Sequence, residues 1–217
     1  MFMKQMLLLI SFFLCVHIYA DSEREQATRV ANRGYKEFLS KCLTPAGREV
    51  HGLTDLENAS NATLGEAIEI LDLTAENIIN FKQGEGVSSL LKTKHSYYFP
   101  VIFNGRTKLL LRVYKWEGSD YEIGSLGDAF IAGEFAKIKK QYPYSREHKM
   151  IYAECYQANA CVFSFPELDN QNVSFINITP GQRTDYSKPS NVDDAVKIML
   201  GNIHESIKAE IQKGVKK

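Results

Sequence analysis

The sequence predicts an α+β fold, in which helices pack on a single, mainly antiparallel sheet of about five to seven strands. Three observations lead to this prediction. Apolar residues recur at helical spacing near both ends of the chain, two stretches alternate in hydrophobicity around turn residues, and a helical pattern lies between these two stretches. Local hairpins with helices inserted between them are typical of α+β domains.

The chain begins with the pattern of a secretory signal. Lys4 precedes an apolar run from Met6 to Val16, and the small residue Ala20 follows it. The run is well short of the roughly 20 apolar residues that a membrane-spanning helix needs. We therefore expect cleavage after Ala20 and a secreted or periplasmic protein without stable membrane insertion. An uncleaved anchor and a lipid on Cys15 are the alternatives.

An amphipathic helix is predicted for residues 22–42. Its apolar positions recur at helical spacing and are Ala27, Val30, Ala31, Tyr35, Phe38 and Cys42. A polar connector follows this helix. Four Asn-x-Ser/Thr sequons, which matter only in a host that glycosylates secreted chains, lie at Asn58, Asn61, Asn172 and Asn177. The expected division is a signal peptide (1–20), the amphipathic helix with its connector (21–63) and an α+β domain (64–217).

The next elements are short. The stretch from Leu64 to Leu73 is ambiguous between a strand and a helix, and we favour a strand. Thr74 then offers an N-cap for a short helix near residues 78–81, and a second short helix is expected over residues 87–91.

The clearest strand signal surrounds Asn104 and Gly105. Alternating runs on both sides of this pair indicate a β-hairpin. A two-residue turn would place Val101 opposite Lys108, whereas a three-residue loop ending on Gly105 places Val101 opposite Thr107. The second register keeps one face of the hairpin apolar, so we predict a bulge turn at Gly105.

The remaining elements alternate between strands and helices. A third short strand is expected over residues 121–123, and a helix from Asp128 to Tyr142 follows it. A second hairpin is expected over residues 150–165, and a further strand over 173–178. A final helix begins at residue 190 or 191. Its apolar stripe consists of Val192, Val196, Met199, Leu200, Ile203, Ile207 and Ile211.

Of the four cysteines, three follow the signal segment, and two of these lie in the second hairpin. If Cys155 opposes Cys161, then Ala153 opposes Phe163, and one face is apolar throughout. In an oxidising compartment this pair predicts a structural disulfide, whereas redox-active pairs usually have the Cys-x-x-Cys spacing at a helix start. Cys42 is left unpaired and is expected to be a buried core thiol.

The charge balance argues against one class of partner. The chain has 26 basic and 26 acidic residues, so its formal net charge is zero. Proteins that bind nucleic acid carry an excess of basic residues that neutralises phosphates. We therefore expect no nucleic-acid partner.

No linear motif indicates catalysis, a cofactor or a metal. His204 and Glu205 begin a zinc-protease pattern, but Lys208 stands where the second histidine ligand belongs. Gly124 is adjacent to Ser125 instead of two residues before it, which does not match the nucleophile elbow of serine hydrolases. We therefore expect no catalytic residue, no metal ligand and no cofactor.

Aromatic residues gather around the first hairpin. Exposed aromatic side chains bind proteins and sugars, while alternation along a strand directs about half of them into the core. The members expected to be exposed, and therefore to bind a ligand or partner, are Tyr98, Tyr114 and Trp116.

These observations favour a secreted or periplasmic, non-enzymatic binding protein, whose partner is an envelope or extracellular protein or glycan. The alternative is an extracytoplasmic hydrolase whose site is not visible as a linear motif and uses Cys42 or a pair of carboxylates. A homodimer formed through the first and last helices is a further hypothesis.

Overall fold

A computed structural model describes residues 23–141, 149–158, 160–165, 173–177 and 191–214. The predicted signal segment, residues 1–20, lies outside the described residues. The chain divides into two compact units: unit 1 consists of Met1–Ala67 and His95–Ala129, and unit 2 consists of Ile68–Lys94 and Phe130–Lys217.

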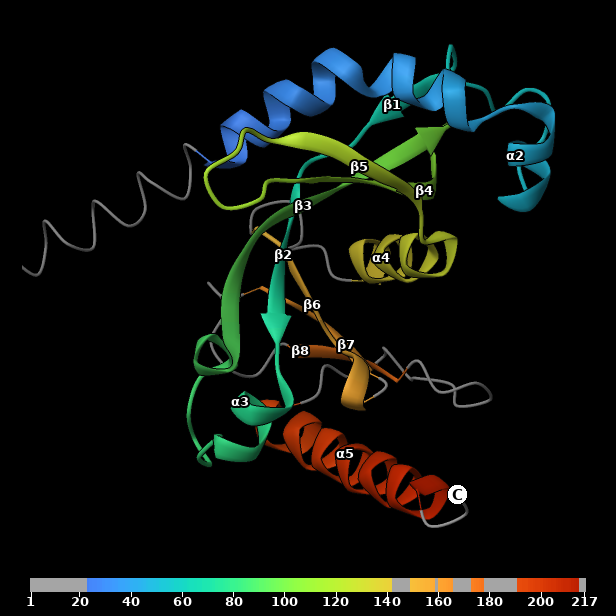
Figure 1. Cartoon of the computed structure of the whole chain (residues 1–217). Helices are drawn as coiled ribbons and strands as arrows, with labels where there is room; N and C mark the ends of the chain where they lie inside the picture. The colour runs from blue at the N-terminus through green and yellow to red at the C-terminus, as the bar shows by residue number, and fades with distance from the viewer. Residues whose placement is uncertain (1–22, 142–148, 159, 166–172, 178–190, 215–217) are drawn as a thin grey trace, which may run out of the picture. The chain divides into compact units, whose positions relative to one another are not determined.

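Figure 1 shows the elements of both units. Unit 1 contains a helix over residues 23–42, α2 (Pro45–Val50), β1 (Ala62–Leu64), most of β3 (Leu91–Phe103), β4 (Arg106–Tyr114) and β5 (Glu122–Gly127). Unit 2 contains β2 (Ile68–Leu73), α3 (Ala75–Asn80), the 3₁₀ turn η1 (Val87–Leu90), nearly all of α4 (Ala129–Gln141), β6 (Ile151–Cys155), the 3₁₀ turn η3 (Tyr156–Ala158), β7 (Ala160–Ser164), β8 (Val173–Asn177) and α5 (Val192–Gly214).

Helices and strands combine into an α+β fold, which confirms the predicted class. The strands pair in the order β5-β4-β3-β2-β6-β7-β8, and β1 pairs with β3 beside this path. The sheet is mixed, because β2 and β6 run parallel, so the prediction of a mainly antiparallel sheet is wrong. Hairpins are marked by their turn residues, whereas this parallel pair sets Ile70 beside the distant Tyr152, and no local pattern indicates it.

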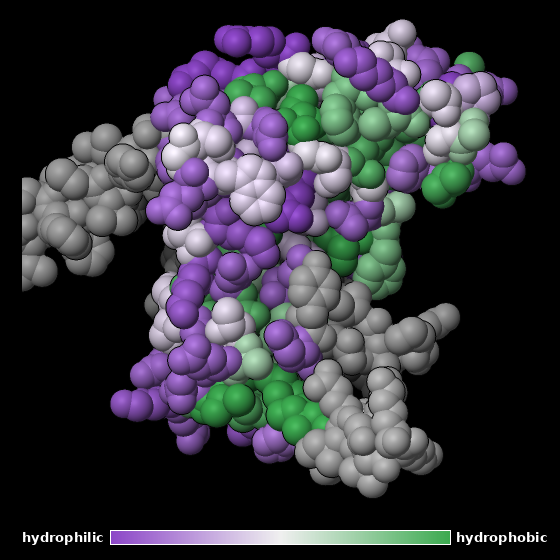
Figure 2. Space-filling model, in the orientation of Figure 1, coloured by the Kyte–Doolittle hydropathy of each residue, from purple (hydrophilic) through white to green (hydrophobic). Residues whose placement is uncertain are grey.

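In unit 1, one face of the sheet packs against the N-terminal helix, which is drawn in blue in Figure 1. The helix contributes Ala27, Ala31 and Leu39 to this core, in agreement with its predicted amphipathic character. Alternate strand positions complete the core: Tyr97, Phe99, Val101, Phe103, Leu109, Leu111 and Val113. Figure 2 shows hydrophilic side chains on the outer side of this helix and hydrophobic ones beneath it.

The polar connector predicted after this helix contains α2 and an irregular loop that the helix holds in place. The Lys36 ammonium group donates hydrogen bonds to the carbonyl oxygens of Ala59, Ser60 and Ala62 at 2.9, 2.8 and 2.7 Å. Each bond is charge-assisted, and such bonds are roughly twice as strong as neutral ones. A single side chain therefore satisfies three backbone groups of a segment that has few regular backbone hydrogen bonds.

The turn of the β3–β4 hairpin differs from the prediction. Phe103 pairs with Arg106 across a two-residue turn. The two turn residues, Asn104 and Gly105, have φ angles of 50° and 74°. These positive angles match a type I′ turn, whose twist suits a hairpin. The predicted three-residue loop with a bulge at Gly105 is therefore wrong.

The extra residue lies further along the hairpin. Ile102 pairs with Thr107, and Val101, the residue before it in β3, pairs with Leu109. Lys108 is therefore the extra residue and forms a bulge in β4. Beyond the bulge the register differs from the predicted one by two residues. Because side chains alternate with a period of two, the same residues still face the core.

In unit 2, both faces of the sheet are covered. On one face, α5 contributes the buried residues Val192, Ala195, Val196, Met199 and Ile203. These include most of the predicted stripe, whereas Ile207 is 46% exposed. On the other face, the Phe135 ring of α4 lies 6.3 Å from the Phe163 ring of β7.

The predicted disulfide between Cys155 and Cys161 is wrong, and both thiols are free. Cys155 pairs with Ala160, and Cys161 pairs with Glu154, so the hairpin differs from the predicted register by one residue. Neighbouring positions on a strand face opposite sides of a sheet. The Cys155 thiol therefore lies in the core with α5, while Cys161 lies on the face covered by α4.

Candidate functional site

The three aromatic residues predicted to bind a partner lie in unit 1, and the structure brings two of them together. Tyr98 is only 5% exposed, and its hydroxyl group donates to the Asp128 carboxylate over 2.8 Å. Trp116 is 68% exposed, and its ring stands edge-on to the Tyr114 ring, with 5.4 Å between the centroids. Tyr98 is therefore an interior residue, while Tyr114 and Trp116 form a solvent-accessible pair.

Arg112 extends this pair into a stack. Its guanidinium carbon lies 5.9 Å from the centroid of the Tyr114 ring, within the range of a cation–π contact. Arg112, Tyr114 and Trp116 occupy alternate positions along β4 and just beyond it, and alternate positions share one face of a sheet. We call these three residues the β4 stack. Sequence reasoning missed Arg112, although its two-residue spacing from Tyr114 was a usable signal.

The neighbouring strands hold the β4 stack in place. Gly124 of β5 lies against the Tyr114 ring, and a Cβ atom at this position would come within 1.9 Å of Tyr114 Cε1. Any other residue at position 124 would displace the ring. On the other side, Ser96 of β3 accepts a hydrogen bond from Arg112 Nε at 3.0 Å.

The turn after β4 fixes the backbone of Trp116. The Trp116 amide donates to Ser119 Oγ at 2.9 Å, and the Ser119 amide donates to the Trp116 carbonyl at 3.0 Å. Gly118 has a φ of 74°, which an L-residue adopts only with strain. The sequence Trp-Glu-Gly-Ser thus forms a closed turn, and Trp116 is presented from a defined backbone conformation.

Acidic residues lie near the β4 stack along the chain, and one of them, Glu122, pairs with Tyr114 across β4 and β5. Glu117, Asp120 and Glu122 are exposed on the segment that joins β4 to β5 and on the start of β5. The hydrogen bond with Glu122 raises the pKa of the Tyr114 phenol above its ordinary value. The surface consequently combines two aromatic rings, one guanidinium group and a rim of carboxylates.

A second polar cluster in unit 1 surrounds Glu23, at the start of the N-terminal helix. Glu23 is 6% exposed. Its Oε1 lies 2.5 Å from Lys115 Nζ, and its Oε2 lies 2.8 Å from His95 Nδ1. Burial opposes ionisation, but hydrogen bonds with Lys115 and His95 hold the pKa of Glu23 below its ordinary value. The carboxylate thus connects the helix to His95 in β3 and to Lys115, the residue that follows β4.

This cluster resembles part of a catalytic arrangement but is better explained as a structural clamp. An imidazole oriented by a buried carboxylate occurs in hydrolases, where it activates a nucleophile. Among the described residues, none brings a hydroxyl or thiol nucleophile into hydrogen-bond contact with His95. The backbone of His95 has a φ of 47°, a strained value that its bond to Glu23 helps to maintain.

Neither alternative of the hydrolase hypothesis, Cys42 or a pair of carboxylates, is supported by a contact among the described residues. Cys42 is half-buried in unit 1, and burial raises the pKa of its thiol, which leaves little reactive thiolate at neutral pH. The buried carboxylates are Glu23 and Glu57 in unit 1 and Glu134 in unit 2. In unit 2, burial together with the charges of Glu154 and Glu134 raises the pKa of Cys161 to about 12. Glu134 is bound to Lys137 at 2.7 Å, and its other carboxylate oxygen is buried with no hydrogen-bond partner among the residues that the structure describes.

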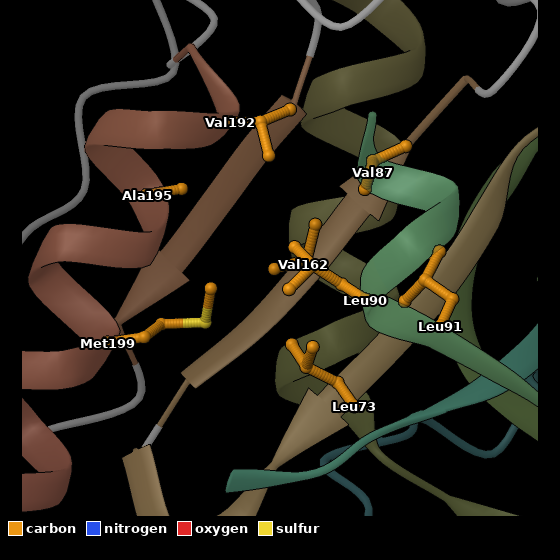
Figure 3. Close-up of a pocket in the computed structure, with 8 residues that line it drawn as sticks. All are labelled: Leu73, Val87, Leu90, Leu91, Val162, Val192, Ala195 and Met199. Carbon is orange, nitrogen blue, oxygen red and sulfur yellow. The ribbon is translucent and has the colours of Figure 1, made fainter. Parts of the chain in front are cut away.

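A small apolar cavity lies in the core of unit 2. Figure 3 shows its aliphatic lining, with Leu73 and Val162 from the sheet and Met199 from α5. Its volume is about 10 Å³, and no polar surface lines it. A cavity of this size accommodates about one water molecule, which would find no hydrogen-bond partner. The cavity is therefore a packing gap and not a ligand site.

Further classes of site are not found in the described part of the chain. Among these residues, no group of three or more histidine, cysteine, aspartate or glutamate side chains is placed to hold a metal ion. No helix of the same residues combines the length and the hydrophobicity needed to cross a membrane. No protein-family model and no curated protein matches the sequence, so the chemistry of the β4 stack is interpreted from its own residues.

Proposed function

We propose that this chain is a secreted or periplasmic binding protein that holds a partner protein through the β4 stack and catalyses no reaction. The observation that supports the proposal is the stack itself. Tryptophan, tyrosine and arginine are the side chains that most often dominate the binding energy of protein interfaces. Here Tyr114 contacts both Arg112 and Trp116, at alternate positions along β4 and just beyond its end.

The surroundings of the β4 stack also suit protein recognition. Interfaces typically have an aromatic centre and a polar rim, and Glu117 and Asp120 supply such a rim. Binding is costly when side chains and loops must first be ordered. The turn bonds of Trp116 and the contact of Tyr114 with Gly124 have already ordered these groups in the free protein.

The free cysteines are compatible with an oxidising compartment. Cys155 and Cys161 lie on opposite faces of the unit 2 sheet, so they do not form a disulfide with each other. Burial raises the pKa of both thiols, and oxidation proceeds through the thiolate. The proposal of export therefore rests on the leader sequence and is consistent with reduced thiols.

A site-specific photo-cross-linking experiment tests the proposal. A photoreactive amino acid replaces the exposed Glu117, next to Trp116, in cells that produce the protein. We expect a discrete protein adduct upon irradiation, and we expect Trp116→Ala in the same chain to abolish it. The same photoreactive residue at Glu49, an exposed position of α2, is the matched control.

Three readouts decide the outcome. Trp116→Ala should leave the thermal unfolding temperature unchanged, because the side chain is 68% exposed. Equal adducts from positions 117 and 49 would contradict a specific surface at the β4 stack. An adduct at position 117 that persists in Trp116→Ala would contradict the role of the tryptophan.

A further inference from the structure

Arg112 has few polar partners among the residues that the structure describes. Its side chain is only partly exposed. Among the described residues, its one hydrogen bond runs from Nε to the neutral hydroxyl group of Ser96, and no carboxylate forms an ion pair with it. Arginine side chains that are largely withdrawn from water are normally paired with an anion. Among the described residues, the partly exposed Arg112 thus has a neutral hydrogen-bond partner and no ion-pair partner.

The contacts of Arg112 fix the orientation of its guanidinium group. Ser96, which is 1% exposed, accepts the hydrogen bond from Arg112 Nε, and the Tyr114 ring lies against the planar guanidinium group. The N–H groups of Nη1 and Nη2 have no partner among the described residues. These two nitrogens form the edge of a guanidinium group that donates two parallel hydrogen bonds to a carboxylate.

Ser125 provides a second donor beside this edge. It is the residue of β5 that pairs directly with Arg112, and it is exposed. Directly opposed residues have Cβ atoms about 5 Å apart and share one face of the sheet. An anion bound to Arg112 would therefore lie within reach of the Ser125 hydroxyl group.

We propose that Arg112 and Ser125 form a binding site for a single carboxylate, supplied by an aspartate or glutamate side chain of the partner protein. The inference rests on the proposed function, because the site adjoins the same aromatic surface. The exposed carboxylates of Glu117, Asp120 and Glu122 repel polyanions. An isolated carboxylate in an otherwise neutral or basic segment therefore fits this surface, whereas a polyphosphate does not.

The intrinsic fluorescence of the protein reports on this site directly. Trp116 is the single tryptophan of the chain, and it belongs to the same stack as Arg112. The probe is a blocked peptide, acetyl-Ser-Phe-Glu-Ser-amide, and its control is the same peptide with glutamine in place of glutamate. We expect a saturable change in Trp116 fluorescence with the glutamate peptide, and roughly tenfold weaker binding of the glutamine peptide, because hydrogen bonds to charged groups are stronger.

Variants identify the groups that bind. Arg112→Lys keeps the charge but loses the planar fork, so we expect it to weaken glutamate-peptide binding by roughly tenfold. Ser125→Ala removes one exposed hydroxyl and should weaken binding by roughly threefold. Arg106→Lys, at the exposed start of the same strand, should bind as the unmodified protein does.

Three results would overturn the inference. These are equal binding of the glutamate and glutamine peptides, unchanged binding by both Arg112→Lys and Ser125→Ala, and saturation by inorganic phosphate where the glutamate peptide has no effect. The peptide assay needs no natural partner. If the peptide binds but position 117 gives no adduct, the carboxylate site is supported and the proposed function is contradicted. If position 117 gives an adduct but the peptide does not bind, only the carboxylate site is contradicted.

Discussion

The two hairpins of this protein fix their strand register in different ways. In the β3–β4 hairpin the tip is exposed, and Asn104 and Gly105 adopt the positive φ angles of a tight turn. In the β6–β7 hairpin every residue of β7 is buried, and packing occurs on both faces of the sheet. The register of the first hairpin is thus a local property, whereas the register of the second depends on helices distant in sequence.

The largest effect is expected where packing fixes the register. Phe163 is 1% exposed and lies 5.1 Å from the Tyr152 ring and 6.3 Å from the Phe135 ring, measured between centroids. Phe163→Ala should lower the free energy of unfolding by roughly 3–5 kcal/mol, because it removes buried area and leaves a cavity. Urea denaturation measures this change.

The matched control is Phe130→Ala in the same unit, because Phe130 is 55% exposed. Its effect should stay within about 0.5 kcal/mol. A similar loss in both variants would show that the β6–β7 hairpin does not depend on the ring cluster of Phe163.

The same contrast explains which features of the fold could be predicted from the sequence. In the β3–β4 hairpin the predicted pairing of Val101 was wrong by two residues, and its face was nevertheless correct. In the β6–β7 hairpin an error of one residue placed Cys155 and Cys161 on the same face, whereas they lie on opposite faces. Because both faces of that hairpin are apolar, hydrophobic alternation could not decide between the two registers.

The candidate site was predictable in part for similar reasons. Tyr114 and Trp116 follow from local aromatic content, and their exposure follows from their place at the end of a strand. The burial of Tyr98 and its bond to Asp128 depend on tertiary contacts that no local pattern reveals. Arg112 became a candidate binding residue only because no described acidic side chain forms an ion pair with it, and a sequence does not show this.

An intermediate effect is expected when a thiol is moved by one residue. The double variant Ala160→Cys, Cys161→Ala places a thiol directly opposite Cys155. We expect a disulfide to form under mild oxidation and to raise the free energy of unfolding by roughly 2 kcal/mol, the chain-entropy value for so short a loop. Mass spectrometry after alkylation detects the bond, and urea denaturation measures the gain.

The unmodified chain is the control for this engineered bond. Its thiols at positions 155 and 161 should remain separate under the same oxidant, because they lie on opposite faces. Formation of the native pair, with no bond in the double variant, would mean that the hairpin adopts the other register.

The smallest effect is expected where turn chemistry fixes the register. Gly105 has a φ of 74°, and a Cβ atom there would meet no other atom within 4 Å. Gly105→Ala should therefore cost only the backbone strain of the left-handed region, about 1 kcal/mol. Gly133→Ala in α4 is the opposite control: it also meets open space, but in a helix, where alanine is favoured over glycine by roughly 0.5–1 kcal/mol. Changes of opposite sign in the free energy of unfolding, measured by urea denaturation, would show that Gly105 acts through its backbone conformation. Stabilisation by both substitutions would mean that the β3–β4 register does not depend on this turn.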